Sequence, residues 1–318
     1  MKKFKINMSF SILFTLFVLN SNGQADTIPK VFEPNTISTG YNERDMAISP
    51  DGKEMFYTIL APRNAFSVIV HRKLINNKWT NAEMAPFSGQ YAELEPAFSP
   101  DGKKLFFVSK RPVKEGIPKK DYDIWYVEKG DKGWSAPIHA GNVINSDVDE
   151  FYPSITNDGS VYFTSARKDA VGQEDIYKSQ FANGSFQPAQ SIGGGVSTKL
   201  DEFNAYVDPA ENYIIFSAAG GEGEIGQGDL YISFRNAHGI WGKAKNLGAP
   251  INSARLDYCP FVYNGLLYFT SDRPVPLYTQ DKKLTIKEFK AKMDSWGNGA
   301  GGDIYTVSIT QLINKLKD

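Results

Sequence analysis

Ile48-Ser49-Pro50-Asp51-Gly52-Lys53-Glu54-Met55-Phe56-Tyr57 returns later in the chain as Phe98-Ser99-Pro100-Asp101-Gly102-Lys103-Lys104-Leu105-Phe106-Phe107. A third copy, Ile155-Thr156-Asn157-Asp158-Gly159, follows, and altered copies begin at Val207 and Val262. The turn glycines are Gly52, Gly102, Gly159 and Gly265, and the copy at Val207 has lost its glycine. A self-similar period of roughly 50 residues is the signature of a repeat architecture.

Each unit has the pattern of four strands. An Asp-Gly or Asn-Gly turn joins the first two strands, and this is the strongest short-range hairpin signal. The third strand opens with Asp-Ile or Asp-Leu and an aromatic residue, at Asp123, Asp175, Asp229 and Asp303. The fourth opens with an aromatic residue, at Trp79, Trp134, Phe186 and Trp241. Four strands in about 50 residues are typical of one blade of a β-propeller.

The sequence therefore predicts an all-β fold, a five-bladed β-propeller with four antiparallel strands per blade. The predicted blades are residues 43–92, 93–149, 150–201, 202–256, and 257–309 together with 26–34. The last unit has no aromatic-led fourth strand of its own, so we expect the N-terminal segment to supply it and close the ring. A six-bladed ring with one degenerate blade is the alternative, but no stretch as long as a whole unit is left over to build it.

Residues 1–25 have the pattern of a signal peptide. A basic start is followed by an apolar run over 8–19 and a small-residue segment that ends at Ala25. We expect cleavage before Asp26 and a single propeller domain over 26–318. An uncleaved anchor is the alternative, although the apolar run is short against the roughly 20 residues that a spanning helix needs. The expected location is periplasmic or secreted, without membrane insertion after cleavage.

Composition narrows the function classes. Of 318 residues, 41% are apolar and 22% are charged, as in ordinary globular proteins. The net charge of −1 becomes −4 once residues 1–25, with three lysines and no acid, are removed, and this charge argues against a nucleic-acid partner. Cys259 is the single cysteine. An intrachain disulfide and a cysteine zinc cage are therefore excluded, and no lipidation cysteine follows the apolar run. We expect a monomer without a metal or a cofactor.

The repeats resemble the WD-like propeller repeats of the TolB-like periplasmic proteins. The similarity rests on the Ser-Pro-Asp-Gly turns, on Ser-x-Arg at 109–111, 165–167 and 271–273, and on the Asp-Ile-Tyr strands, over about residues 40 to 310. It implies the propeller fold, which is shared by enzymes, binding proteins and scaffolds. TolB-like proteins have six blades and a separate N-terminal domain, whereas this sequence predicts five blades and one domain.

The loops predict which face of the ring binds. The blade connections and the loops between second and third strands share one face, here called the loop face, and it carries 60–66, 112–122, 168–174, 220–228 and 274–302. The Asp-Gly hairpins share the other, here called the turn face, and we expect it to offer little for binding. Loops held on a rigid scaffold commonly carry binding residues.

One carboxylate recurs at the start of every innermost strand, and the five are Glu43, Glu93, Glu150, Glu202 and Asp257. We expect them to ring the mouth of the central channel and to attract a cation or a basic partner. Arg111, Arg167 and Arg273 end second strands nearby. They could instead pair with these carboxylates, or with Asp123, Asp175 and Asp303, to support the fold.

The insertion 274–302 in the fifth blade is expected to contain a short helix packed over the loop face. Thr285 and Glu288 fit a capping box, and Ile286, Phe289 and Met293 fall on one helical face. This segment is expected to be either a lid that plugs the channel or a partner-binding element. We expect Trp296 to anchor it, with a stacking platform for a sugar ring as the alternative.

The sequence has no nucleophile elbow, zinc-binding His pair or phosphate-cradling loop, the usual signatures of catalytic sites. We therefore predict a non-enzymatic binding propeller that holds a protein or glycan partner of the envelope or the extracellular space on its loop face. The alternative is a carbohydrate-active hydrolase or lyase, since two channel carboxylates about 5–10 Å apart would suffice. An assembly scaffold is a third hypothesis.

Overall fold

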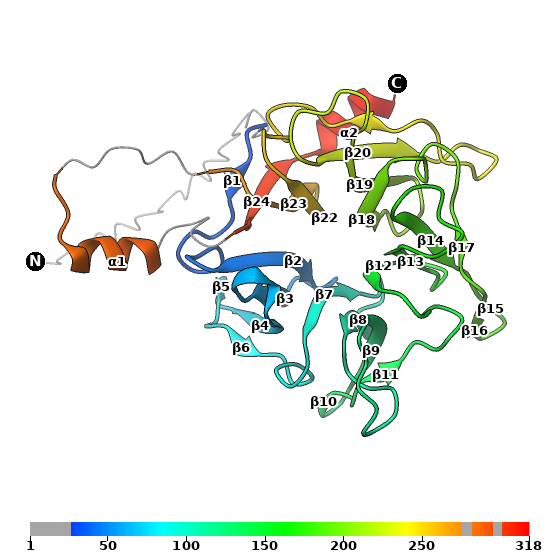
Figure 1. The fold of residues 1–318 in the computed structure, drawn as a ribbon, viewed down its shortest axis with the longest axis horizontal. Coiled ribbons are helices and arrows are strands. Elements are labelled where there is room, and N and C mark those ends of the chain that lie inside the picture. Colours follow the sequence, from blue (N-terminus) through cyan, green and yellow to red (C-terminus); the bar gives the residue numbers. More distant parts are fainter. Residues whose placement is uncertain (1–26, 275–281, 295–300, 318) are drawn as a thin grey trace, which may run out of the picture.

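The computed structural model describes residues 27–274, 282–294 and 301–317. Within these ranges, five antiparallel sheets surround a central axis (Figure 1). This confirms the five-bladed β-propeller. The predicted signal peptide, residues 1–25, lies outside the described residues. In the part of the chain that is described, no helix is long and apolar enough to cross a membrane.

The first two blades share one plan, in which three long strands are followed by two short ones. The first contains β2 (Asn42–Ile48), β3 (Glu54–Leu60), β4 (Ser67–Ile75), β5 (Lys78–Trp79) and β6 (Glu83–Met84). The second contains β7 (Glu93–Phe98), β8 (Lys104–Ser109), β9 (Asp123–Gly130), β10 (Gly133–Trp134) and β11 (Ile138–His139). The short outer strands both pair with the third strand, so the predicted fourth strand is broken into two pieces.

The other blades vary this plan. The third contains β12 (Glu150–Ile155), β13 (Val161–Ser165), β14 (Asp175–Ser179) and β17 (Gln190–Ser191), with a side hairpin of β15 (Phe181–Ala182) and β16 (Ser185–Phe186). The fourth contains β18 (Asp201–Val207), β19 (Tyr213–Ala219), β20 (Asp229–Phe234) and β21 (Lys245–Asn246). The fifth contains β22 (Asp257–Tyr263), β23 (Leu266–Ser271), β24 (Asp303–Ser308) and, from the other end of the chain, β1 (Lys30–Val31).

The N-terminal strand closes the ring, as predicted. β1 lies antiparallel to β24 with Val31 opposite Tyr305 (Figure 1, blue beside red). The Phe32 amide extends this pairing by donating a hydrogen bond of 2.8 Å to the Ile304 carbonyl. The Phe32 ring meets Tyr268 of β23 edge-on at 5.1 Å. The two chain ends are thereby joined through one blade.

The repeated Ser-Pro-Asp-Gly sequence builds the same turn each time. In the first copy the Ser49 hydroxyl donates to Asp51 at 2.6 Å and accepts from the Glu54 amide at 2.9 Å. Gly52 takes φ = 73°, a conformation that glycine adopts without steric cost. In the fourth blade, where the glycine is lost, Glu211 takes the left-handed position with φ = 57°.

The hydrophobic core lies between the blades. Five clusters of buried side chains each combine residues of two adjacent sheets, such as Phe56 of the first blade with Phe107 and Trp125 of the second. The cluster between the fourth and fifth blades also receives Leu312 and Leu316 of the C-terminal helix α2 (Thr310–Lys317). Each blade therefore depends on both neighbours for its buried surface.

The insertion contains a helix, α1 (Ile286–Asp294), whose capping box forms as predicted: Thr285 Oγ1 accepts from the Glu288 amide and the Glu288 carboxylate accepts from the Thr285 amide. The prediction that this helix packs over the loop face is wrong. Ile286 and Phe289 are 71% and 42% exposed, and α1 lies beside the ring (Figure 1). Trp296 lies outside the described residues.

Candidate functional site

The five recurring carboxylates are buried, and they do not line an open channel mouth. Glu43, Glu93, Glu150, Glu202 and Asp257 are each 0 or 1% exposed. Every one accepts a hydrogen bond from the backbone amide four residues before it, at 2.6 to 3.2 Å. Burial raises the pKa of the four glutamates. The shared geometry fixes the connection that enters each blade, so we assign these carboxylates to the fold.

The three arginines support the same connections. Arg111, Arg167 and Arg273 pair with Glu93, Glu150 and Asp257, at 2.9, 3.1 and 2.6 Å. Each guanidinium also donates to a carbonyl of the loop that leads into the blade, at Phe87, Ile144 and Ile251. Each lies over aromatic rings of its own blade. These contacts engage all three guanidinium groups in holding the fold together.

A different set of side chains reaches the axis. Every innermost strand carries a bulge two residues after its carboxylate. The bulged residues all have left-handed φ between 48° and 61°, and they are Asp45, Glu95, Tyr152, Asn204 and Cys259. A non-glycine residue rarely adopts this conformation. Its repetition in five blades turns five unlike side chains toward one another.

These residues form a polar cluster, here called the axial cluster, with Arg44. The Arg44 guanidinium donates to Asp45 at 2.7 Å and to Glu95 at 3.0 Å, and it lies 3.3 Å from the Cys259 sulfur. The other Glu95 oxygen accepts from the Tyr152 amide at 2.6 Å. Burial, with Asp45 adding to it, raises the pKa of Glu95 to about 8 although Arg44 acts against this. Burial also raises the pKa of the Cys259 thiol.

A pocket of about 240 Å³, here called the loop-face pocket, lies on one side of the axial cluster. Arg44, Glu95 and Asn204 form its inner end, and the loop residues Tyr122 and Glu174 join its walls. Burial, together with the nearby charges of Asp201 and Asp149, raises the pKa of Glu174 to about 7. No hydrogen bond to the Glu174 carboxylate occurs among the described residues. Convergent polar groups with shifted pKa values in a concave site are typical of binding and catalytic sites.

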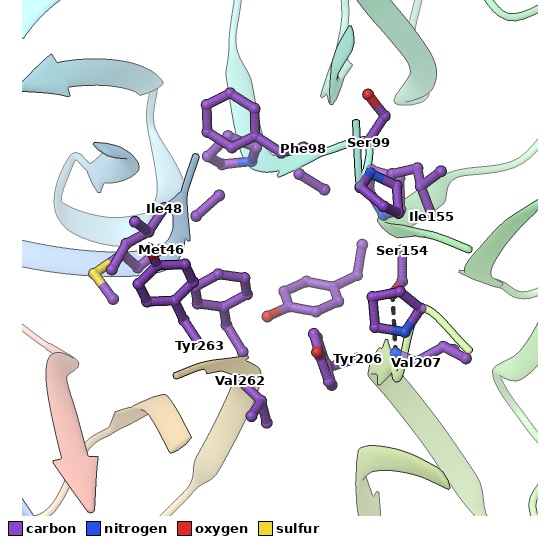
Figure 2. Close-up of a pocket in the computed structure, with 18 of the residues that line it drawn as sticks. Met46, Ile48, Phe98, Ser99, Ser154, Ile155, Tyr206, Val207, Val262 and Tyr263 are labelled. Atoms are coloured by element: carbon purple, nitrogen blue, oxygen red, sulfur yellow. Dashed lines mark hydrogen bonds between the residues drawn. The ribbon is translucent and has the colours of Figure 1, made fainter. Parts of the chain in front are cut away.

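A second pocket, of about 270 Å³, lies on the other side of the axial cluster and is here called the turn-face pocket. Figure 2 shows residues that line it. Side chains from all five innermost strands surround it, and the turn residues Pro50, Pro100 and Pro209 lie among its walls. The prediction that the turn face offers little for binding is therefore wrong. Each hairpin taken alone is tight, but the ring of hairpins encloses a space.

The raised carboxyl pKa values predict that stability falls as pH rises. Folded Glu95 and Glu174, with pKa values of about 8 and about 7 against an ordinary 4.5, hold their protons more tightly than the unfolded chain does. Their contribution is complete below pH 4.5 and is lost as pH rises through about 7 to 8. We expect the thermal unfolding midpoint to decrease from pH 5 to pH 8. Glu174→Gln should flatten this decrease, whereas Glu115→Gln at an exposed loop position should not. A midpoint that rises over the range would contradict the prediction.

Part of this site has a signal in the sequence beyond the repeat pattern. Pro96, Pro153 and Pro260 stand in the middle of innermost strands, and proline inside a strand indicates an edge or a bulge. A bulge at the preceding residue points to Glu95, Tyr152 and Cys259. Glu174 has no such signal, because its neighbours in the pocket come from other loops. Within the described residues, no group of three or more His, Cys, Asp or Glu side chains is placed to hold a metal ion.

Solved structures similar to this chain include two TolB proteins. TolB from Acinetobacter baumannii is 15% identical, with 89% of this chain and 64% of that protein covered and a TM-score of 0.45. A putative TolB from Agrobacterium tumefaciens is 14% identical, with 90% and 99% covered and a TM-score of 0.46. A complex of BT0996 and RGII contains a protein that is 7% identical, with 89% and 92% covered and a TM-score of 0.53.

No protein-family model matches the sequence, and no curated protein matches it. The chain spans less than two thirds of the length of the Acinetobacter TolB. The fold of the described chain is a five-bladed β-propeller. At these identities the likeness to solved structures concerns the fold alone.

Proposed function

We propose that this protein is a periplasmic or secreted, monomeric binding propeller that holds a protein partner on its loop face, through a basic group of that partner. The observation that carries the proposal is the loop-face pocket, where Glu95 and Glu174 converge with the aromatic ring of Tyr122. The signal-peptide pattern of residues 1–25 supports the location. The variable loops around the pocket supply the rest of the surface.

The charges around the pocket favour a cation. Asp149 and Asp201 stand close enough to Glu174 to raise its pKa, and Asp272 interacts with Arg44 at the inner end. Arg44 is the one basic residue among the pocket's described lining, and Asp45 and Glu95 already engage it. A lysine or arginine side chain would relieve the repulsion among the acids. The ring of Tyr122 already has Lys110 Nζ 4.5 Å from its centre, so the acids and not this ring would hold the incoming charge. A neutral glycan would leave that repulsion in place.

Charge reversal in the pocket tests this proposal. Glu174→Lys should weaken the binding of a lysine-containing peptide at least tenfold, because it replaces an attractive charge with a repulsive one. Titration calorimetry at pH 8, where Glu174 is mostly ionised, measures the effect. For the native protein we expect weaker binding at pH 6, because Glu174, with a pKa of about 7, is then mostly protonated.

The control is Glu115→Lys, which makes the same reversal on an exposed loop of the same face, outside the pocket. It should leave the affinity within about twofold. Equal weakening by both variants would mean that peptides respond to net charge alone, and the proposal would fail. Binding of neutral oligosaccharides that ignores Glu174→Lys would establish a glycan partner instead.

A hydrolase or lyase is the second candidate, and one observation favours it. Glu95 and Glu174 line the same pocket with pKa values raised to about 8 and about 7, as a general acid at neutral pH requires. In such an enzyme these residues, and not the buried Glu150 or Glu202, would be the working pair. Turnover in a broad glycan screen that Glu174→Gln abolishes would establish this function in place of the binding one.

A further inference from the structure

The turn-face pocket has a composition unlike that of the loop-face pocket. Its walls contain six prolines, several aliphatic side chains and five aromatic rings, which belong to Phe98, Tyr152, Tyr206, Phe261 and Tyr263. Glu95 is the single carboxylate among its described lining residues, and no lysine, arginine or histidine is among them. The Glu95 carboxylate already accepts from Arg44, Asn204 and the Tyr152 amide. An apolar ligand would therefore leave few polar groups of the pocket without a hydrogen-bond partner.

The space exists because one layer of the ring mixes small and large side chains. Five residues hold equivalent positions in the innermost strands, where pairing resumes after the bulge. They are small in the first three blades, where they are Ala47, Ala97 and Ser154. They are large in the other two, where Tyr206 and Phe261 meet edge-on at 6.0 Å. Three adjacent small residues leave one side of the axis unfilled.

The size and the walls define what would fit. An enclosed apolar cavity of about 150 Å³ binds benzene, and this pocket measures about 270 Å³. It therefore has room for a two-ring compound. Phe261 and Tyr263 lie nearly parallel, with an interplanar angle of 10°, and aromatic walls favour flat rings in stacked or edge-on contact.

We propose that the turn-face pocket is a binding site for an uncharged aromatic small molecule of one or two rings. It lies on the opposite side of the axial cluster from the loop-face pocket. The five innermost strands would hold such a ligand by burying its faces against Phe98, Tyr206 and Tyr263 (Figure 2). This inference does not depend on the function proposed for the loop face.

Titration with 1-naphthylamine tests the proposal, because this two-ring compound is uncharged at neutral pH and its fluorescence changes in apolar surroundings. We expect one saturable site per molecule, with displacement by indole. Ala97→Phe should raise the dissociation constant at least tenfold by filling the unfilled side. Val262→Trp fills the pocket from the fifth blade and serves as a second variant if Ala97→Phe does not fold.

Ala82→Phe is the matched control, since it adds the same ring at an exposed position away from the pocket. It should leave the dissociation constant unchanged. Circular dichroism identifies the variants that are folded. The proposal is overturned if folded filling variants bind 1-naphthylamine as the native protein does, or if binding never saturates and indole does not compete.

Discussion

Replacing Arg167 with alanine is expected to lower the free energy of unfolding by about 3 kcal/mol, because removing one partner of a buried ion pair leaves the other charge without compensation. The stranded group is Glu150, which is 0% exposed. The substitution also removes the guanidinium from the Ile144 carbonyl and from the rings of Phe163 and Tyr177. Denaturant unfolding at pH 8 measures the loss.

A double-mutant cycle separates the charge from the packing. Glu150→Gln removes the stranded charge, so Arg167→Ala should cost clearly less in that background than in the native protein. Arg255→Ala, at an exposed position, should change stability by less than about 0.5 kcal/mol. If Arg167→Ala costs no more than Arg255→Ala, the pair does not hold the third blade to its entering loop.

Deleting residues 26–34 is expected to lower the unfolding midpoint by about 10–20 °C, since each kcal/mol corresponds to about 2–4 °C in a chain of this size. The deletion removes β1 from the edge of β24, and it removes the packing of Phe32 on Tyr268. Loss of a buried phenylalanine side chain costs about 3–5 kcal/mol. Phe32 is half-buried, and the loss of the β1–β24 pairing adds to the loss of stability that its removal causes. Differential scanning calorimetry measures the midpoint.

The same deletion should make the protein self-associate. An uncovered strand edge presents unpaired backbone groups to other chains, and β24 would be left in that state. Light scattering after gel filtration reports the mass in solution. A deletion of 26–28 ends before β1 and should behave as the native protein does. A stable, monomeric product of the longer deletion would show that β1 is not needed to close the ring.

The fold could be predicted because the same local pattern recurs in every blade. Each Ser-Pro-Asp-Gly turn fixes one hairpin. The aromatic residue expected to open the fourth strand lies instead in a side hairpin in the third blade (Phe186) and in an isolated bridge in the fourth (Trp241). Even the closing strand was predictable, since the last unit lacks a strand and residues 28–32 offer one. The turns and strands depend on residues that are close together in the sequence, so the repeated sequence pattern is enough to predict them.

The candidate site depends on contacts between blades, and the pattern says little about those. The repeated carboxylates were predicted to form a site because they recur in every blade. A residue that recurs in every repeat can equally support the fold, and Glu150 and its equivalents accept hydrogen bonds from the backbone that leads into their own blades. The axial residues, from Asp45 to Cys259, differ in every blade, so their own identities do not select them. Only the prolines that follow Glu95, Tyr152 and Cys259 mark three of the five positions. Helix α1 was placed wrongly because amphipathic spacing predicts a helix without saying which surface it contacts.

The hydrophobic cores lie between the blades, and the β1–β24 pairing closes the ring. Together these two features determine when during synthesis the chain can complete its fold. No blade has a core of its own, and Lys30 lies opposite Thr306, so the last contact needed is among the longest-range contacts in the molecule. Contacts of this kind are slow to form because a large loop must close first. A chain still emerging from the ribosome would expose the face of its last finished blade that later packs against the next blade. The ring can close only when both ends of the propeller have left the ribosome.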